Sequence, residues 1–304
     1  MMYRELLEGI FQRNNLTDEA ACARHLRDLQ PYARKLWESY QAPDVIVDYS
    51  DRKTQEAYLL RYFPFYLMPL IEEMGQLNHG GSELPHTELF EAAFFGCGPG
   101  PEILGLMLHL MNVKSPTTMI SAQLIDSAAE TWAYSRNLVL EHLAEPAWAP
   151  KLVDYVSTSA CLTDSEALAA AAVDGCHFAV VQNCLNEVPL RLAGCVVENL
   201  MSQFARLAPG AIVLVVDRSG YKKTDLMMQA MHAIAAESEN IVSIRGEGPQ
   251  QRSIDCSKTL KDVPDIVTNN LFHRWGDSRP TDWAIDGLIF AKKIDYVSMA
   301  FQVR

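Results

Sequence analysis

The stretch Phe94-Phe95-Gly96-Cys97-Gly98-Pro99-Gly100-Pro101-Glu102 decides how this chain folds. Its glycine turn lies between the apolar run 92–95 and residues 103–111, whose apolar side chains recur with helical spacing. An apolar run, three glycines at every second position and then a helical period indicate a strand, a tight turn and a helix. This unit is typical of the entry to a nucleotide-binding α/β sheet.

The spacing of the glycines argues against a dinucleotide site. That site needs G-x-G-x-x-G, so that backbone N–H groups at the start of the helix can bind the pyrophosphate. Counted from Gly96 or from Gly98, the third glycine is replaced by Pro101 or Ile103. Pro101 also lacks an N–H, and Glu102 places a negative charge in the first helical turn. We therefore expect a ligand that presents no phosphate to this turn.

The G-x-G-x-G of Gly96, Gly98 and Gly100 resembles motif I of the class I S-adenosylmethionine-dependent methyltransferases. A second strand is expected over 118–125, directly before Asp126. In that family an acidic residue at the end of this strand holds the ribose hydroxyls, and the resemblance implies this role for Asp126. A carboxylate suits it because it offers two acceptor oxygens to two donors. The resemblance also implies S-adenosylmethionine as cofactor and methyl transfer as activity.

Strands and helices alternate after residue 86, which predicts a doubly wound α/β domain with a mostly parallel sheet. Residues 1–85 carry mainly helical signals, with a Gly- and Pro-punctuated linker at 75–85. The predicted domains are therefore a helical extension, 1–85, and a cofactor-binding domain, 86–304. Seven strands are expected, the number in the class I methyltransferase sheet, whose last strand is antiparallel: 91–95, 118–125, 151–157, 177–182, 211–217, 240–246 and 284–291.

Ligands of such sheets bind beyond the carboxyl ends of the strands. Residues at these ends, with one arginine from the extension, are the candidates for cofactor binding: Arg61, Gly96, Cys97, Gly98, Gly100, Glu102, Asp126, Ser127, Cys161, Leu162 and Asn183.

The resemblance suggests individual roles for some of these residues. It implies that Arg61 binds the methionine carboxylate and that Cys161 or Leu162 packs on the adenine. Asp164 either accepts from the adenine amino group or caps a helix. The family usually has an acidic residue two positions before the first glycine, where this chain has Phe94. Glu102 or a residue from the N-terminal segment is then the candidate to support the methionine amino group.

Candidates for substrate binding come from an aromatic-rich helix and from the later strand ends: Tyr62, Tyr66, Asn186, Tyr221 and Trp275. Packing of the extension onto the sheet is the alternative role for the aromatic residues, with Arg61 in a surface ion pair. Trp132 is expected to pack a helix on the sheet. Methyl transfer from a sulfonium needs at most one nearby base. The candidates for that base are Glu187, Asp217 and His273, the last within a long connection, 246–283, that we expect to cover the substrate.

The composition favours a small-molecule substrate over nucleic acid. The formal net charge of −12 opposes binding to a phosphate backbone, which depends on Lys and Arg. Seven cysteines without a C-x-x-C pair indicate reduced core residues of a cytoplasmic protein, with no zinc site. Asn183, Asn186, Glu187 and Asp217 could form a metal cluster on paper, but we expect no metal. No signal peptide or membrane span is expected, and a homodimer is compatible with the sequence.

Two rival functions stay open. The order of an aromatic-Pro-aromatic helix, G-x-G-P-G and C-L-N-E-V distantly resembles a ribosome-associated methyltransferase-like family, which implies an RNA substrate. The negative charge, and the lack of a cysteine cluster in the last third of the chain, argue against it. The second rival is a module that binds S-adenosylmethionine without transferring its methyl group. A base N-methyltransferase is disfavoured, because no Asn-Pro-Pro-Tyr or Asp-Pro-Pro-Tyr follows the fourth strand.

Overall fold

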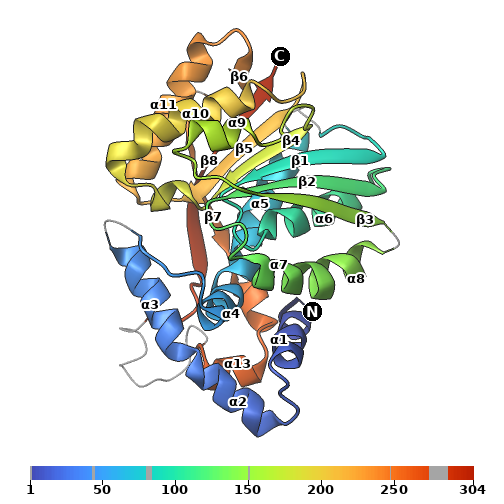
Figure 1. Cartoon of the computed structure of the whole chain (residues 1–304), viewed down its shortest axis with the longest axis vertical. Coiled ribbons are helices and arrows are strands. Elements are labelled where there is room, and N and C mark those ends of the chain that lie inside the picture. Colours follow the sequence, from blue (N-terminus) through green and yellow to red (C-terminus); the bar gives the residue numbers. More distant parts are fainter. Residues whose placement is uncertain (1, 43–44, 80–83, 150, 247, 274–286) are drawn as a thin grey trace.

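The computed structural model describes residues 2–42, 45–79, 84–149, 151–246, 248–273 and 287–304. Their strands form one sheet in the order β3-β2-β1-β4-β5-β8-β6 (Figure 1). β7 pairs with the first part of β8, and β6 pairs with its last residues. The strands from β1 to β5 run parallel, and β8 runs antiparallel to β5, β6 and β7. The strands are β1 Leu89–Phe95, β2 Met119–Asp126, β3 Leu152–Ser159, β4 Phe178–Gln182, β5 Ile212–Arg218, β6 Ile241–Ser243, β7 Gln250–Asp255 and β8 Lys293–Val303.

Helices cover both faces of this sheet, as a doubly wound fold requires. Alternate residues of β1 divide between the faces: Phe95 packs with α10 and α11, and Phe94 packs with α5 and α6. The helices are α1 Met2–Arg13, α2 Glu19–Asp28, α3 Gln30–Gln41, α4 Arg52–Arg61, α5 Phe63–His79, α6 Pro101–Asn112, α7 Ala133–Val139, η1 Leu140–Ala144, α8 Glu145–Trp148, α9 Ser165–Ala169, η2 Leu185–Glu187, η3 Leu190–Leu192, α10 Ala193–Phe204, α11 Lys222–Glu237, α12 Ser257–Lys261 and α13 Asp265–Asn270. The predicted α/β fold is confirmed.

The end of the sheet differs from the predicted one. The last strand is β8, 293–303, and not 284–291. Leu288 and Phe290, which made 284–291 read as a strand, are buried in the core formed with the N-terminal helices. The predicted strand 240–246 shrinks to β6, and pairing with β8 resumes at β7. The connection 246–283 therefore contains β7, α12 and α13 within its described part.

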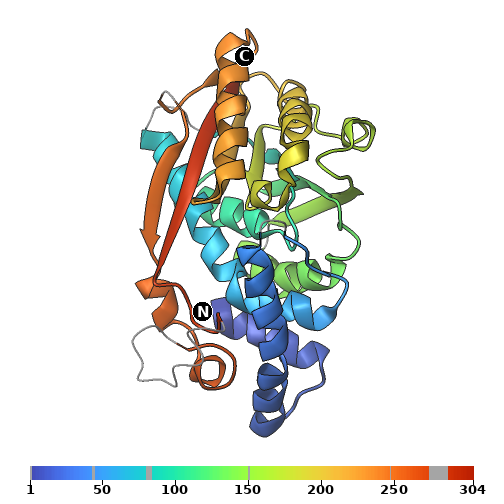
Figure 2. The ribbon, with the colours of Figure 1, turned by 90° about the vertical axis from the view of Figure 1, so that its left-hand side faces the viewer.

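Both ends of the described chain contribute to one helical layer beside the sheet. Leu6, Leu26 and Leu60 from the N-terminal helices share a hydrophobic core with Leu271 and Phe290. Figures 1 and 2 show α1 to α4 and α13 gathered at the end of the molecule opposite the C-terminus. The division of the chain at residue 85 stays a prediction, and this shared core shows that the layer is not built from 1–85 alone.

Prolines mark the helix boundaries of the extension. Pro31 lies in the first turn of α3, where its missing N–H costs no helical hydrogen bond. Pro64 follows the break between α4 and α5, so the aromatic-rich segment forms two helices. The second of them, α5, extends to His79 and covers the sheet beside α6, so helix occupies the first part of the predicted linker. Buried Glu73 anchors α5, because it accepts from the Tyr296 hydroxyl of β8 at 2.8 Å and pairs with Arg245.

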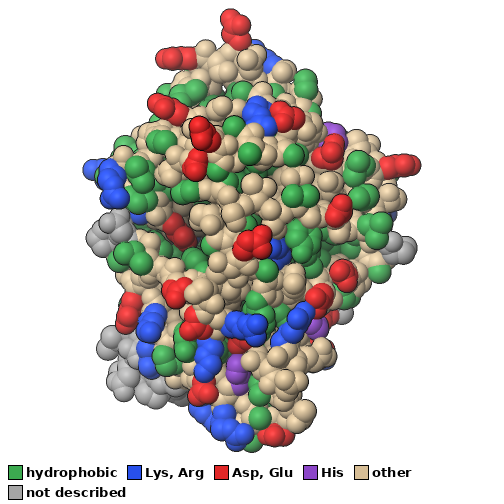
Figure 3. Space-filling model, viewed as in Figure 1, with side chains coloured by type: hydrophobic (Ala, Val, Ile, Leu, Met, Phe, Trp, Pro, Cys, Tyr) green, Lys and Arg blue, Asp and Glu red, His purple; other side chains and the backbone are tan. Residues whose placement is uncertain are grey.

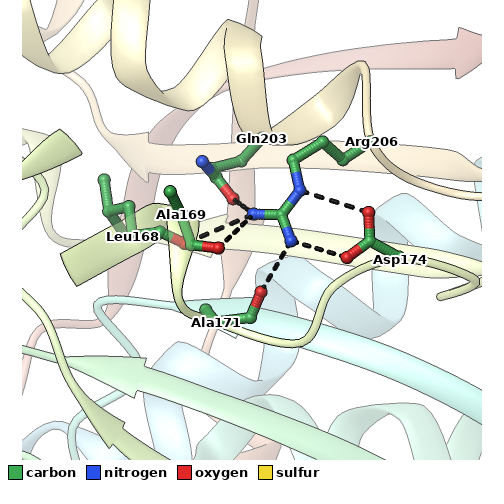
Figure 4. Close-up of polar contacts among 6 residues, drawn as sticks. All are labelled: Leu168, Ala169, Ala171, Asp174, Gln203 and Arg206. Atoms are coloured by element: carbon green, nitrogen blue, oxygen red, sulfur yellow. Dashed lines mark hydrogen bonds and ion pairs between the residues drawn. The ribbon is translucent and has the colours of Figure 1, made fainter. Parts of the chain in front are cut away.

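The segment after β3 is held in place by Arg206, at the end of α10 (Figure 4). Its guanidinium pairs with both carboxylate oxygens of Asp174, at 3.2 and 2.6 Å. It also donates to the Ala169 and Ala171 carbonyls, at 3.2 and 2.9 Å, and to Gln203 Oε1 at 2.7 Å. These contacts satisfy carbonyl groups at the end of α9 and fix the path from α9 to β4.

The remaining features are the surface charge, the hydropathy of the helices and the state of the cysteines. On the face in Figure 3, most Lys and Arg side chains lie over the helical end of the molecule, among Asp and Glu. In the part of the chain that the structure describes, no helix is long and apolar enough to cross a membrane. All seven cysteines are free, but Cys161 and Cys195 are exposed and are not the core residues that we expected.

Candidate functional site

The glycine turn has the conformation that its sequence predicts. Gly96, Gly98 and Gly100 have φ angles of +65°, +51° and +78°, a region that residues with a side chain rarely adopt. The Gly96 N–H donates to the Ile125 carbonyl of β2 at 2.7 Å, which joins the turn to the neighbouring strand. A Cβ at Gly96 would lie 2.5 Å from the Cys184 Cβ. Glycine is therefore required here both for the backbone and for the close approach of Cys184.

Asp126 is the last residue of β2 and contacts the glycine turn directly. One carboxylate oxygen accepts from the Gly98 N–H at 2.9 Å, and the other accepts from the Ala128 N–H at 2.7 Å. The side chain is buried, and this burial raises its pKa above the ordinary value. Each oxygen can accept a second hydrogen bond, so Asp126 can hold the turn and still bind two ligand hydroxyls.

A cavity of about 390 Å³, here called the glycine-turn cavity, lies at the carboxyl ends of β1, β2, β3 and β4. Most of the sequence-predicted site residues line it: Tyr66, Gly96, Cys97, Gly98, Glu102, Asp126, Ser127, Cys161, Leu162, Asn183 and Glu187. Gly100 does not line this cavity, and its role is to begin α6 with a left-handed backbone. Asn183 also has a positive φ, +52°, at the point where the chain leaves β4.

The charges around the cavity have one sign. Glu102, Asp126 and Glu187 line it, and no Lys or Arg does so among the described residues. Glu102 Oε2 is buried without a hydrogen-bond partner, and burial raises the pKa of this carboxyl well above its usual range. An unsatisfied buried oxygen is costly, so it marks a place for a donor from a ligand. The cavity favours a cation.

Glu187 is held by two tyrosines of the N-terminal layer. Its Oε1 accepts from the Tyr40 hydroxyl at 3.2 Å and from the Tyr49 hydroxyl at 3.4 Å. Burial raises its pKa to about 7, although these hydrogen bonds act in the opposite direction. A carboxyl with a pKa in this range can accept and release a proton near neutral pH.

Aromatic rings close the cavity from the side of the N-terminal layer. The Tyr49 ring lies 4.4 Å from the Trp132 ring, and the Tyr58 ring lies 5.2 Å from it, between ring centroids. Gln55 fixes this contact, since its amide donates to the Tyr49 and Thr131 carbonyls, both at 2.7 Å. Tyr49 and Trp132 were missed as site residues. Trp132, six positions after Asp126, was expected to pack a helix on the sheet, and nothing local reveals that it also faces a cavity.

Asp217 and Asn186 support the site from behind. Asp217 is fully buried and accepts from the Leu185, Asn186 and Arg218 N–H groups at 2.9, 3.3 and 2.7 Å. Burial raises its pKa to about 7. Neither Asp217 nor Asn186 lines the glycine-turn cavity, and their action on a substrate stays a prediction. Asp217 fixes the turn that carries Glu187.

Three further predicted residues lie elsewhere, and a fourth is not among the described residues. Asp164 caps α9 through the Ala167 N–H at 3.0 Å, which is the second of its two predicted roles. The Tyr221 hydroxyl donates to the Tyr40 carbonyl at 2.8 Å and does not line the cavity. His273 pairs with Ile289 in an isolated bridge and does not line it either. Trp275 lies outside the described residues.

A second cavity, of about 440 Å³, adjoins the first and is here called the arginine cavity. Arg61 and Tyr62 line it, and Tyr66 lines both cavities. Arg61 is therefore not on the glycine-turn cavity, where the resemblance had placed it. Its guanidinium lies over the Tyr62 and Phe272 rings, 5.3 and 5.4 Å from their centroids, and has no ion pair with a described residue.

The described residues contain no group of three or more His, Cys, Asp or Glu side chains arranged to hold a metal ion. The four-residue cluster considered from the sequence is divided, since Asn183 and Glu187 line the cavity while Asn186 and Asp217 do not.

Comparison with known proteins finds similarity only at the level of structure. No protein-family model and no curated protein sequence matches this chain. An O-methyltransferase family protein from Burkholderia thailandensis aligns at 14% identity over 93% of this chain and 71% of its own, with a TM-score of 0.39. A methyltransferase from Pyrococcus furiosus aligns at 13% identity over 77% and 82%, with a TM-score of 0.36. The 16S rRNA methyltransferase KamB aligns at 12% identity over 75% and 93%, with a TM-score of 0.40. At these TM-scores we base the function on the geometry of this chain alone.

Proposed function

We propose that this protein is an S-adenosylmethionine-dependent methyltransferase that acts on a small molecule. The observation that carries the proposal is the glycine-turn cavity, where three carboxylates and no described Lys or Arg line a space beside the turn. S-adenosylmethionine has a cationic sulfonium, a cationic amino group, one carboxylate and no phosphate, so its net charge is +1. Its charge therefore matches a cavity that would repel a dinucleotide.

The residues of the cavity fit the parts of this cofactor. Asp126 lies at a strand end with spare acceptor capacity on both oxygens, which suits the two ribose hydroxyls. Glu102, whose Oε2 lacks a partner, suits the amino group. Cys161 and Leu162 offer an apolar contact for the adenine from the segment after β3.

S-adenosylmethionine would supply a methyl group on a positively charged sulfur: a nucleophile forms a bond to the methyl carbon in line with the S–CH3 bond, which breaks, and S-adenosylhomocysteine leaves. The chain's own task is to position the nucleophile and to exclude water, and positioning can lower the barrier by roughly 7–11 kcal/mol. The aromatic wall of Tyr49, Tyr58 and Trp132 keeps water from one side of the cavity. Glu187 can take the proton of an amine or hydroxyl nucleophile.

Binding tests the cofactor directly. We expect calorimetry to show one-to-one binding of S-adenosylmethionine and S-adenosylhomocysteine, and no heat with NAD. Binding of NAD without a response to S-adenosylhomocysteine would refute the proposal.

Methyl transfer is tested with methyl-labelled cofactor, total RNA and a small-metabolite extract. We expect label in the metabolite fraction, because a protein with a net charge of −12 repels a polyanion. Label confined to RNA would replace the small molecule by a ribosomal substrate. Cofactor binding with no labelled product in either pool would indicate a non-catalytic binding module.

A further inference from the structure

The arginine cavity has the opposite charge to the glycine-turn cavity. Arg61 and Arg218 line it, and neither forms an ion pair with a carboxylate among the described residues. Nε and Nη1 of Arg61 are buried and have no hydrogen-bond partner. Asp295 and Lys293 also line the cavity, but they pair with each other at 2.8 Å and their charges cancel. Within the described part of the chain the cavity therefore holds two guanidinium groups without a paired carboxylate, and the Arg218 side chain hydrogen-bonds to Tyr66.

A buried donor without a partner destabilises the protein, and the cost is larger when the group is charged. The Tyr62 and Phe272 rings stabilise the Arg61 cation through its face, but they accept none of its in-plane N–H bonds. A planar carboxylate can accept two such bonds side by side, a geometry that a guanidinium matches well. The arginine cavity is therefore suited to a carboxylate.

The rest of the cavity is apolar and flat-sided. Trp37, Phe65 and Phe290 line it together with Tyr62. Aromatic rings at these positions favour a flat, apolar ligand body, which leaves the two arginines to select its charged end.

The two cavities are joined through shared residues. Tyr66 lines both of them. Tyr40 lines the arginine cavity, and its hydroxyl donates to Glu187, which lines the glycine-turn cavity. A molecule in the arginine cavity therefore lies beside Tyr66 and Tyr40, and the Tyr40 hydroxyl connects that cavity to Glu187.

We propose that the arginine cavity binds the acceptor substrate and selects a small organic acid with a flat apolar body. That the bound acid is the methyl acceptor rests on the proposed methyl transfer. The selection of an acid rests only on Arg61 and Arg218. A single carboxylate also agrees with the net negative charge of the protein, which disfavours a polyanion at long range but leaves a small monoanion able to enter a locally positive cavity.

The test compares acids with amides of the same shape. The probes are phenylacetate, 3-phenylpropanoate and indole-3-acetate, each beside its primary amide, with dissociation constants measured by ligand-observed NMR. We expect the wild-type protein to bind the acids at least about tenfold more tightly than the amides, because a charge-assisted hydrogen bond is worth more than one factor of ten. Equal affinities, or no binding of any acid at millimolar concentration, would overturn the proposal.

Variants assign the preference to the cavity. In Arg61→Gln and in Arg218→Gln the acid-to-amide ratio should fall below about threefold, since half of the positive charge is lost. Lys292→Gln is the matched control, because it also removes a positive charge, from an exposed side chain that does not line the cavity. Its ratio should equal that of the wild type. Arg61→Lys keeps the charge but not the planar fork, and should show an intermediate preference. This variant is the test of Arg61 if Arg61→Gln fails to fold.

S-adenosylhomocysteine binding is measured on the same samples, so that the two proposals can fail separately. Acid preference without S-adenosylhomocysteine binding would leave an anion site and refute methyl transfer. Binding of S-adenosylhomocysteine without acid preference would refute the acid substrate alone. Loss of S-adenosylhomocysteine affinity in Arg61→Gln, with acid binding unchanged, would also overturn the inference and return Arg61 to the methionine carboxylate.

Discussion

At the scale of single residues, Asp126 both stabilises the glycine turn and lines the proposed cofactor cavity. It holds the Gly98 N–H and lines the cavity, so its loss should weaken both. We expect Asp126→Ala to weaken S-adenosylhomocysteine binding by about 2–4 kcal/mol and to lower the free energy of unfolding by about 1–3 kcal/mol. Calorimetry and urea denaturation measure the two effects.

Asp164→Ala is the matched control for this prediction. Asp164 also follows a strand and also accepts from a backbone N–H, but it does not line the cavity. Its removal should cost about 1 kcal/mol of stability through the lost helix cap and leave cofactor affinity unchanged. An Asp126→Ala protein that binds S-adenosylhomocysteine as tightly as the wild type would remove Asp126 from the site.

Glu187 should make cofactor binding depend on pH. Because burial raises its pKa to about 7, the carboxyl is mostly protonated at pH 6 and mostly ionised at pH 8. The sulfonium of S-adenosylmethionine favours the ionised form, whereas S-adenosylhomocysteine has no such charge. The affinity ratio of the two ligands should therefore rise between pH 6 and pH 8, by up to about tenfold. Glu187→Gln should flatten this ratio in calorimetric titrations, and a flat wild-type profile would contradict the role of Glu187.

The same raised pKa predicts how the free protein responds to pH. Between about pH 4.5 and pH 7 the folded state keeps a proton on Glu187 that the unfolded chain has released. This group therefore lowers the free energy of unfolding as the pH rises through that window. Asp217, whose pKa is also raised to about 7, acts in the same direction. The hydrogen bonds of Asp217 come from the backbone and stabilise the fold, whereas Glu187 accepts from two tyrosines and lines the cavity.

At the scale of elements, the glycine turn owes its shape to space as well as to backbone angle. Gly96→Ala and Gly210→Ala both place a side chain at a positive φ, +65° and +86°, which costs about 1–2 kcal/mol. Only at Gly96 would the new Cβ also meet Cys184, at 2.5 Å, while nothing lies within 4 Å of it at Gly210. Gly96→Ala should therefore lose at least about 1 kcal/mol more in denaturant unfolding. Equal losses would show that the turn can move away from Cys184.

At the scale of the whole molecule, the helical layer unites the two ends of the described chain. Phe290 packs its ring 6.2 Å from that of Tyr3 and 4.9 Å from that of Phe272, between centroids. We expect Phe290→Ala to cost about 3–5 kcal/mol and to speed amide hydrogen exchange in α1 and α4, far away in sequence. Leu226→Ala, at an exposed position, should change neither. Faster exchange confined to residues near 290 would show that the two ends do not stabilise each other.

The sequence by itself determined the parts of this protein that depend on neighbouring residues. Three glycines at every second position predict the left-handed turn, because only glycine tolerates these angles without strain, and the strand end at Asp126 follows from an apolar run that stops at a charge. Alternation of strand and helix predicts the doubly wound sheet, since each element must bury one face.

Only the tertiary structure decided which of these residues meet. Leu288 and Phe290 read locally as a strand, but they are buried against helices from the other end of the chain. Arg61 and Glu102 were both expected at the methionine part of one cofactor, yet they line different cavities. Asp217, a candidate base from its place at a strand end, accepts from three backbone N–H groups. Burial and distance between remote segments set these roles, and no local pattern of residue types contains that information.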